Sequence, residues 1–339
     1  MLISPSLSPM RAAVPIIKGL ADPHRGKVRD TYDLGNGYLL VVVSDAISIF
    51  DFVLNAMIPD KGMILMVLTH MVMTMLEAQG IPTHLVAAGA GIDQYLPPHL
   101  RGNPALQSRA LIVRRLKMYP REFVFRDYFV KASTAFKDYD PAIGGTICGL
   151  ALPPGLRDGD KLPRTMATPT TKAKVGHDMP VDSVDTAAEY PEGTELVGRA
   201  FKAVSEFTLT KRILELDAKG ESGIDESGRP TLGDEFGTGD CSRFVDYDEW
   251  IASRAMPEPK TPPSFDKQPI RAWGITFGLN DPKQFDPENA RDIERVHEIE
   301  LPPSVNNAAV KRNRQLAVRL LDMSAEEYLQ KHLGVTMRA

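Results

Sequence analysis

The amino-acid sequence predicts an α+β fold of two lobes, made of antiparallel sheets and helices. The chain begins with strand patterns separated by turn residues, and both helical and strand patterns follow. A chain of 339 residues is also longer than one hydrophobic core usually serves. Pro120 interrupts a β-rich segment and suggests a hinge. We therefore expect one lobe at residues 1–118 and a second at residues 119–339.

The first segment with a clear pattern is GKVRDTYDLGNGYLLVVVSD, residues 26–45. It predicts an alternating strand, a Gly-Asn-Gly turn, and an apolar strand over residues 38–43. The Met-rich run GMILMVLTHMVMTMLEAQG, residues 62–80, is too short and too interrupted to span a bilayer. It predicts a buried helix that ends at Gly80. Soft-metal binding by its methionines and His70 is a less favoured alternative to core packing.

Later segments predict a change from strands to helices. Residues 110–130 predict an interrupted pair of strands. Residues 140–185 are rich in loop-forming residues, and so long an irregular stretch is typical of a functional loop. Residues 186–216 predict a helical span, and residues 257–263 a proline-rich connection. The chain closes with helical segments around the break at residues 302–303.

Composition restricts the class of protein. The chain has 43% hydrophobic and 25% charged residues, which is ordinary for a soluble globular protein. A net charge of -4 gives no electrostatic reason to expect nucleic acid as a partner. Cys148 and Cys241 lie far apart without metal-type spacing, so a reducing, cytoplasmic location fits. Prolines near the N-terminus interrupt any signal-peptide core. We expect no membrane partner, and a monomer or small homo-oligomer.

The segment LDAKGESGIDESGRPTLGDEF predicts an acidic hairpin. With Ser227-Gly228 as a two-residue loop, Glu221 would lie opposite Asp234, and like charges across a ladder destabilise a hairpin. A divalent cation between them would remove the conflict, and Mg²⁺ prefers oxygen ligands of this kind. Asp217 lies about 13 Å along the strand from Glu221, so we expect it to bind a substrate hydroxyl instead. A solvent-facing acidic hairpin is the alternative.

Two basic segments are candidates for binding anions. In RGKVRDTYDLGNG, Gly26 would allow backbone N–H groups to approach phosphates, with Lys27 and Arg29 as countercharges. The segment lacks the P-loop pattern, and an exposed basic hairpin is the alternative. In TPTTKAKVGHD, hydroxyls and Lys172 suit an anionic small molecule, although an ordinary polar loop explains the composition too. His177 is a candidate acid or base there, but a lone loop histidine usually has neither role.

Two further segments place basic residues beyond the acidic hairpin. In GDCSRF, Arg243 could make a bidentate phosphate contact, and a surface salt bridge is the alternative. In PPSFDKQPIRAW, Lys267 and Arg271 lie between prolines and aromatic residues. Packing of a C-terminal segment explains most of that second pattern.

Many short motifs occur in an order that resembles one family, the SAICAR synthetases (phosphoribosylaminoimidazole-succinocarboxamide synthases) of purine biosynthesis. The motifs include GKVRDTYDL, SDAISIFDFVL, IPDKG, VRRLKMYPREFVFRDY, CGLALPPGL, DKLP, TPTTKA, GHD, GDEF, SRF and PSFDKQPIRAW. The resemblance implies an ATP-dependent ligase with two α+β lobes and ATP between them. The family joins the carboxylate of a ribosylated aminoimidazole 5'-phosphate to the amine of L-aspartate. ATP is thought to phosphorylate the carboxylate before the amine displaces phosphate.

The resemblance also implies roles for individual residues. The nucleotide would be covered by Gly26, Lys27 and Arg29, with its adenine near Met118, and Glu221 and Asp234 would hold Mg²⁺. Catalytic roles fall on Lys27, Asp217 and Lys219. The imidazole substrate would contact Arg126, Ser133, Thr170, Thr171, Lys172, Asp240, Arg243 and Lys267. Phosphoryl transfer depends mostly on positioning and charge neutralisation, so such a set is sufficient equipment.

The sequence departs from the family pattern mainly around the imidazole substrate. The departures are Ala46, Asp127, Lys131, Ala132, Gly220, Ser222, Gly239 and Cys241. Three hypotheses follow: a SAICAR synthetase that tolerates these changes, a ligase with a changed carboxylate or amine substrate, or a nucleotide-binding protein without catalysis. The retained lysine and acidic residues matched to ATP and Mg²⁺ count against the third.

Overall fold

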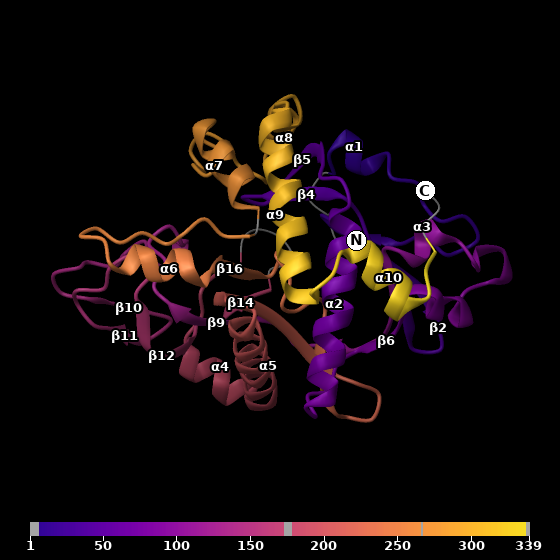
Figure 1. Cartoon of the computed structure of the whole chain (residues 1–339), viewed down its shortest axis with the longest axis horizontal. Helices are drawn as coiled ribbons and strands as arrows, with labels where there is room; N and C mark the ends of the chain where they lie inside the picture. The colour runs from indigo at the N-terminus through magenta and orange to yellow at the C-terminus, as the bar shows by residue number, and fades with distance from the viewer. Residues whose placement is uncertain (1–6, 173–177, 266, 337–339) are drawn as a thin grey trace.

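The computed structural model describes residues 7–172, 178–265 and 267–336 (Figure 1). Within them, the N-terminal part forms an antiparallel sheet in the order β1-β2-β3-β7-β6. The strands are β1 (His24–Arg25), β2 (Arg29–Gly35), β3 (Tyr38–Val43), β6 (Leu85–Ala88) and β7 (Ala110–Arg114). The turn between β2 and β3 has positive φ at Gly35, Asn36 and Gly37, a conformation that glycine adopts without steric cost. The predicted hairpin over residues 26–45 is therefore confirmed.

A second, larger sheet is centred on one long strand, β14 (Ile213–Ile224). The first half of β14 pairs with β9 and β16, and its last residues pair with β15 and β8. The other strands are β8 (Lys117–Met118), β9 (Arg121–Tyr128), β12 (Lys161–Ala167), β13 (Thr170–Thr171), β15 (Pro230–Gly233) and β16 (Ser242–Asp246). Two separate hairpins are β4 (Ala46–Ile49) with β5 (Phe52–Met57), and β10 (Gly145–Ile147) with β11 (Leu150–Leu152).

Helices cover both sheets and fill the space between them. The α-helices are α1 (Pro9–Ala12), α2 (Lys61–Ala78), α3 (Pro104–Gln107), α4 (Ser183–Glu189), α5 (Pro191–Thr210), α6 (Tyr247–Arg254), α7 (Gln268–Thr276), α8 (Ala290–His297), α9 (Pro303–Leu321) and α10 (Ala325–Leu333). Short 3-10 turns are η1 (Gly89–Tyr95), η2 (Pro98–Leu100) and η3 (Thr134–Phe136). Figure 1 shows α2 and α9 side by side at the centre of the molecule, where they are in contact.

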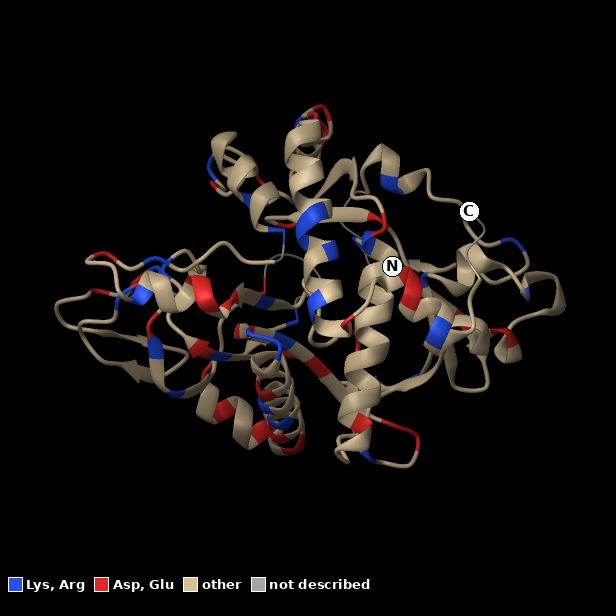
Figure 2. Ribbon diagram, in the orientation of Figure 1, with Lys and Arg blue, Asp and Glu red and all other residues tan. Residues whose placement is uncertain are grey.

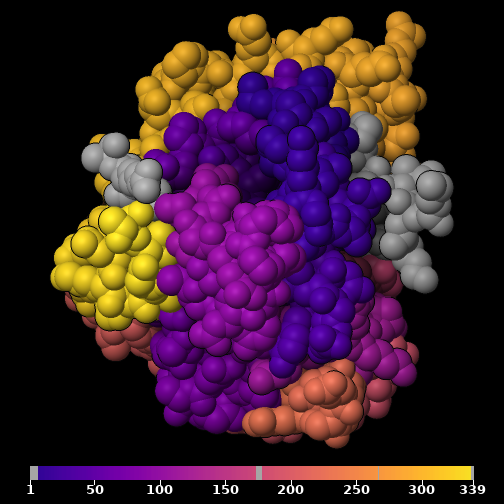
Figure 3. All heavy atoms as spheres, turned by 90° about the vertical axis from the view of Figure 1, so that its right-hand side faces the viewer, coloured from indigo at the N-terminus to yellow at the C-terminus, as the bar shows by residue number. Residues whose placement is uncertain are grey.

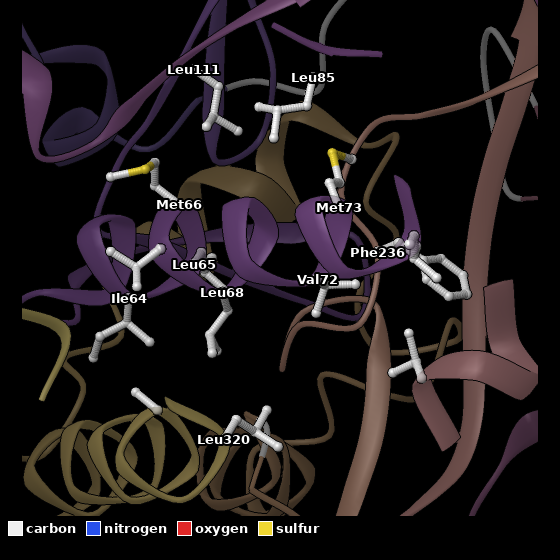
Figure 4. Packing of buried hydrophobic residues seen from close by; sticks show 14 of the residues in the cluster. Ile64, Leu65, Met66, Leu68, Val72, Met73, Leu85, Leu111, Phe236 and Leu320 are labelled. Carbon is white, nitrogen blue, oxygen red and sulfur yellow. The ribbon is translucent and has the colours of Figure 1, made fainter. Parts of the chain in front are cut away.

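The Met-rich helix α2 is the centre of the main hydrophobic core (Figure 4). Met66 and Met73 face Leu111 and Leu85 of the N-terminal sheet, while Leu320 of α9 lies on the opposite side. By length and composition α2 could cross a membrane, but 67% of its apolar window is buried inside the protein. Such burial is what a core helix shows, so the prediction of a buried helix before Gly80 is confirmed.

The same core joins the two predicted lobes. It contains residues of α2 and β7 together with residues of β9, α5, α9 and α10, and all of them belong to one cluster. The strand β8, at the end of the first predicted lobe, pairs with β14 of the second. The division at residue 118 stays a prediction, and a continuous apolar layer crosses it.

Two predictions of local structure are wrong. The described part of residues 140–185 contains four strands, β10 to β13. Three of them have only two or three residues, too few for alternation to be visible, and the longer β12 has an irregular burial pattern. The helical span expected over residues 186–216 ends at Thr210, and the chain then enters β14 at Ile213. Nearly every residue of β14 is buried, so its sequence lacks the period-two signal of a half-exposed strand. His177 lies outside the described residues.

Candidate active site

The acidic hairpin differs by one residue from the predicted register. Glu221 pairs with Gly233, not with Asp234, because the loop has three residues, Glu226 to Gly228. Gly228 has φ of +83° and the Asp225 carboxylate accepts hydrogen bonds from the loop backbone, which stabilises this longer turn. The expected direct opposition is therefore wrong.

Asp234 follows the end of β15 with φ of 54°, a left-handed conformation. The Arg29 guanidinium of β2 forms ion pairs with both Asp234 and Glu235, joining the N-terminal sheet to the hairpin. Buried His84 donates from Nε2 to the Asp234 carbonyl oxygen at 3.0 Å. Burial lowers the pKa of His84 to about 4, so the ring is neutral at pH 7. These contacts hold Asp234 in its strained conformation from two sides.

Glu221 is also surrounded by charge. Its carboxylate pairs with Lys172, while Lys219, two residues earlier, pairs with Glu122 at 2.7 Å. Burial raises the pKa of Glu221, and the negative charge of Asp234 raises it further. Glu221 and Asp234 are close in sequence to the same strand pair, although they are not cross-strand partners. Figure 2 shows both acidic and basic residues along β14.

An apolar surface adjoins these charges. A small pocket is bounded by Arg29, His84, Asp234 and Glu235 on one side and by side chains of β3, α2 and β7 on the other; the latter are Val41, Val43, Thr69, Leu111 and Val113. Its volume of about 20 Å³ is enough for a water molecule but not for a larger ligand. Met118 lies at the hairpin, with its sulfur 3.1 Å from the position that a Cβ on Gly233 would occupy.

Lys27 and Arg29, the two basic residues predicted at the N-terminal hairpin, contact different parts of the structure. Arg29 reaches the acidic hairpin, whereas Lys27 pairs with Asp51 at 2.5 Å at an exposed position. Gly26 lies in the turn, and its N–H donates to the Arg29 carbonyl oxygen at 2.7 Å. Of the two countercharges expected for phosphates, Arg29 is therefore the one that contacts the candidate metal ligands.

A second charged cluster surrounds Asp217, four residues before Glu221 on β14. Asp217 Oδ2 accepts hydrogen bonds from Arg126 at 3.0 Å and from Arg243 at 2.8 Å, and all three side chains are mostly buried. Arg126 also donates to the Thr168 hydroxyl at 2.9 Å. One carboxylate between two guanidinium groups leaves a positive charge, which suits an anion such as phosphate.

Lys61, which is not among the predicted site residues, forms a third charged contact, with Asp240. Its Nζ lies 2.6 Å from Asp240 Oδ2, and the Lys61 side chain is almost fully buried. Burial opposes ionisation of Asp240, but Lys61 and Lys267 outweigh it and hold the pKa of Asp240 well below its usual range. Lys61 belongs to the quoted IPDKG motif, which was the available signal. Glu122, His84 and Glu235 were also missed.

Of the remaining predicted substrate residues, Thr170 contacts a cluster residue, whereas Thr171 and Ser133 make local hydrogen bonds. The Thr170 hydroxyl donates to Glu122 at 3.2 Å, whereas the Thr171 hydroxyl accepts from the Met179 backbone at 3.0 Å. The Ser133 hydroxyl accepts from the Ala135 N–H at 3.4 Å and so caps the turn η3.

The departures on β14 have a structural reason. A Cβ on Gly220 would lie 2.6 Å from Val197 and 2.8 Å from the Phe236 ring, so these side chains already fill the space. Ser222 is fully buried, and its hydroxyl has no hydrogen-bond partner among the described residues. Its neighbour Gly193 allows α5 to approach closely. The apolar packing lost from β14 is thus partly supplied by other segments.

The departures outside β14 are also accommodated. Asp127 accepts a hydrogen bond from the Thr165 hydroxyl at 2.6 Å, which ties β9 to β12. The Lys131 backbone N–H donates to Asp158 at 2.9 Å, and its side chain is exposed, as is Ala132. Ala46 is fully buried in β4. The half-buried Cys241 accepts from the Thr238 N–H at 3.4 Å, and desolvation raises the pKa of its thiol to about 12.

The carboxylates fit a metal that arrives with a nucleotide. Across residues 7–172, 178–265 and 267–336, no group of three or more His, Cys, Asp or Glu side chains is arranged to hold a metal ion alone. Mg²⁺ commonly takes one or two protein carboxylates and completes its shell with phosphate oxygens and water. Glu221 and Asp234 supply such a pair.

Comparisons with known proteins identify the family of the chain. Residues 22–285 match the family model described as SAICAR synthetase. The phosphoribosylaminoimidazole-succinocarboxamide synthase of Thioalkalivibrio sulfidiphilus is 36% identical over 309 residues, covering 89% of this chain and 95% of the relative. That of Nitrosomonas europaea is 39% identical over 259 residues, covering 74% and 82%. The SAICAR synthase of Saccharomyces cerevisiae, solved with SAICAR, has a TM-score of 0.74 at 28% identity, covering 91% of this chain and 97% of that one.

The fold and these matches define an ATP-dependent carbon–nitrogen ligase with an α+β architecture. Within that class, the chain belongs to the SAICAR synthetase family.

Proposed function

We propose that this protein forms an amide between 5-amino-1-(5-phosphoribosyl)imidazole-4-carboxylate and L-aspartate, giving SAICAR, ADP and phosphate. The observation that carries the proposal is the separation of two charged clusters along β14. Arg126, Asp217 and Arg243 form a positively charged cluster, whereas Glu221 and Asp234 belong to a carboxylate-rich one. A ligase that brings a phosphorylated substrate to a metal-bound nucleotide needs both kinds of site side by side.

In this proposal the carboxylate-rich cluster receives the nucleotide. Glu221 and Asp234 hold Mg²⁺, which when bound neutralises charge on the phosphates. Arg29 and Lys172 now pair with these carboxylates, and both are long enough to turn toward phosphates instead. The base lies near Met118, which packs against Gly233 of the hairpin.

The positively charged cluster receives the imidazole substrate. Arg126 and Arg243 bind its phosphate as bidentate donors, while Asp217 orients both guanidinium groups and accepts from a ribose hydroxyl. Lys219 lies between the two clusters on the same strand. Burial opposes its charge, but Glu122 raises the pKa of Lys219, so it stays cationic and can stabilise charge on the acyl group. Asp240 and Lys267 line the adjoining region.

The first test is ADP release by the purified protein with Mg-ATP, L-aspartate and the imidazole carboxylate, each omitted in turn. Release that requires all three, together with SAICAR detected by mass spectrometry, supports the proposal. ADP release with a different carboxylate or amine, but not with these, would assign a changed substrate. ATP binding without turnover on any acceptor would refute the ligase role. This function implies a cytoplasmic location and partners that are small-molecule substrates.

A further inference from the structure

The N-terminal arm, residues 8–14, precedes residues 22–285, which match the family model. It consists of Ser8, the short helix α1 and the two residues after it. In the space-filling view, the indigo N-terminal part of the chain forms a continuous band over one face of the molecule (Figure 3). The arm packs behind the turn that joins β1 and β2, the turn expected to cover the nucleotide. Its contacts there are buried and specific.

Arg11 is the centre of these contacts. Its side chain is fully buried, and its guanidinium donates to both oxygens of Asp30, at 2.5 and 3.3 Å. The same guanidinium donates to the carbonyl oxygen of Gly26 at 3.3 Å. A buried arginine is costly unless it is paired, so this position is strongly specified. One side chain thus joins the arm to the first residue of the turn and to β2.

Arg25 ties the arm to the same carboxylate from the other side of the turn. It contacts Asp30 at 3.2 Å and donates to the carbonyl oxygens of Arg11, Ala12 and Val14. These carbonyls lie at the end of α1, where a cation is favourable. Arm, β1 and β2 therefore share one buried carboxylate.

The opposite face of β2 points into the candidate active site. Successive side chains of a strand point to opposite faces, so Asp30 contacts the arm while Arg29 reaches Asp234 and Glu235. If the backbone moved at Asp30, Arg29 would move as well, because the two are consecutive residues of β2.

We propose that Arg11 is a positioning residue for the nucleotide: through Asp30 and the Gly26 carbonyl it fixes the β1–β2 turn and the direction of Arg29. This inference rests on the proposed function insofar as that turn covers ATP. The N-terminal arm is then part of the nucleotide site although it need not touch the ligand.

The test compares Arg11→Met and Arg11→Lys with a matched control, Arg115→Met. Arg115 pairs with Asp33 at 2.6 Å near the other end of β2, where both side chains are exposed. Affinity for Mg-ATP is measured by calorimetry without the other substrates, and the KM of the imidazole substrate is measured separately. We expect Arg11→Met to weaken ATP binding by about tenfold or more, Arg11→Lys to lose less, and the control to lose nothing.

The KM of the imidazole substrate should stay unchanged in all three variants, a split that a general loss of structure would not produce. Unchanged ATP affinity in Arg11→Met, or an equal loss for both ligands, would overturn the inference. If Arg11→Met does not fold, Arg11→Lys takes its place. Its loss of ATP affinity is then compared with its change in the KM of the imidazole substrate by the same criterion. Wild-type protein that binds ATP but releases no ADP would refute the proposed reaction, and the comparison of ATP affinities would still decide the role of Arg11.

Discussion

The two ends of the charged segment of β14 have opposite formal charge. At one end a single carboxylate, Asp217, lies between two arginines, which leaves one positive charge. At the other, four carboxylates face three basic groups, which leaves one negative charge; these groups are Glu122, Glu221, Asp234 and Glu235 with Arg29, Lys172 and Lys219. The first end suits an anion and the second a cation, so one strand carries two sites of opposite charge.

Both ends carry departures from the family pattern. Gly220 and Ser222 flank Glu221 at the negative end, and Asp127 follows Arg126 at the positive end. Phe236 and Val197 fill the space at Gly220, and the Thr165 hydroxyl donates to Asp127. The three charged side chains of the positive cluster remain in contact with one another. Packing around a site can therefore be replaced by neighbours, while the charges that bind the ligand stay.

The largest effect should come from removing a charge at the negative end. Asp234→Asn should lower kcat by on the order of 10²–10³-fold, because it removes one of two carboxylates for the metal. The fold should persist, since Arg29 keeps its pair with Glu235. Steady-state kinetics over a Mg²⁺ series measures the effect, with Asp33→Asn as a surface control. Full activity would rule out the metal assignment.

A smaller effect is expected at the positive end. Arg243→Gln should raise the KM of the phosphate-bearing substrate by roughly 10–100-fold, because a charge-assisted hydrogen bond is lost. ATP affinity should not change if the two ends act separately. Kinetics with each substrate varied in turn tests this, and an equal loss of ATP affinity would break the division into two sites.

Stability should respond to the departure at Gly220. Gly220→Phe, which restores an aromatic residue, should destabilise the protein by about 1–3 kcal/mol, because Val197 and Phe236 already occupy the space. Combining it with Phe236→Ala should cost less than the sum of the two changes. Thermal unfolding of the single and double variants gives this coupling. Strict additivity would show that Phe236 does not compensate.

The smallest effect is a pH dependence at the positive end. Burial raises the pKa of Glu215, two residues before Asp217, to about 8. Below that pH the side chain is neutral; above it a negative charge appears beside the positive cluster. The KM of the phosphate-bearing substrate should therefore rise from pH 7 to pH 9 more in the wild-type protein than in Glu215→Gln. Equal slopes would exclude Glu215 as the cause.

The raised pKa of Glu215 also predicts how the stability of the fold changes with pH. A carboxyl whose pKa is raised by folding stabilises the fold at low pH, and that stability is lost as pH rises toward about 8. As the pH rises from about 4.5 to about 8, the Tm of the wild-type protein should therefore fall relative to that of Glu215→Gln.

Several features could be predicted from the sequence because they depend on local chemistry. The Gly-Asn-Gly turn and the buried α2 follow from residue type and apolar content. The acidic hairpin was found, but its register was missed because a three-residue loop with Gly228 at positive φ looks like a two-residue one. The ordered motifs gave the family and most charged residues.

Other features depend on contacts that sequence spacing does not encode. His84 is a single histidine 150 residues from Asp234, and its role is visible only where β6 approaches the hairpin. The pairing of Lys27 with Asp51, and of Arg29 with the hairpin, depends on which way the β1–β2 turn faces. Tertiary structure decides such partners.

The central position of α2 has a consequence for synthesis of the chain. Residues 61–78 leave the ribosome early, but two of the helices that cover them, α9 and α10, end only at Leu321 and Leu333. Most of the protein must therefore be made before this apolar helix is enclosed. Nascent chains with such exposed surfaces aggregate readily and are what chaperones bind. Dependence on chaperones during translation, more than stability once folded, should limit the yield of the protein in a foreign host.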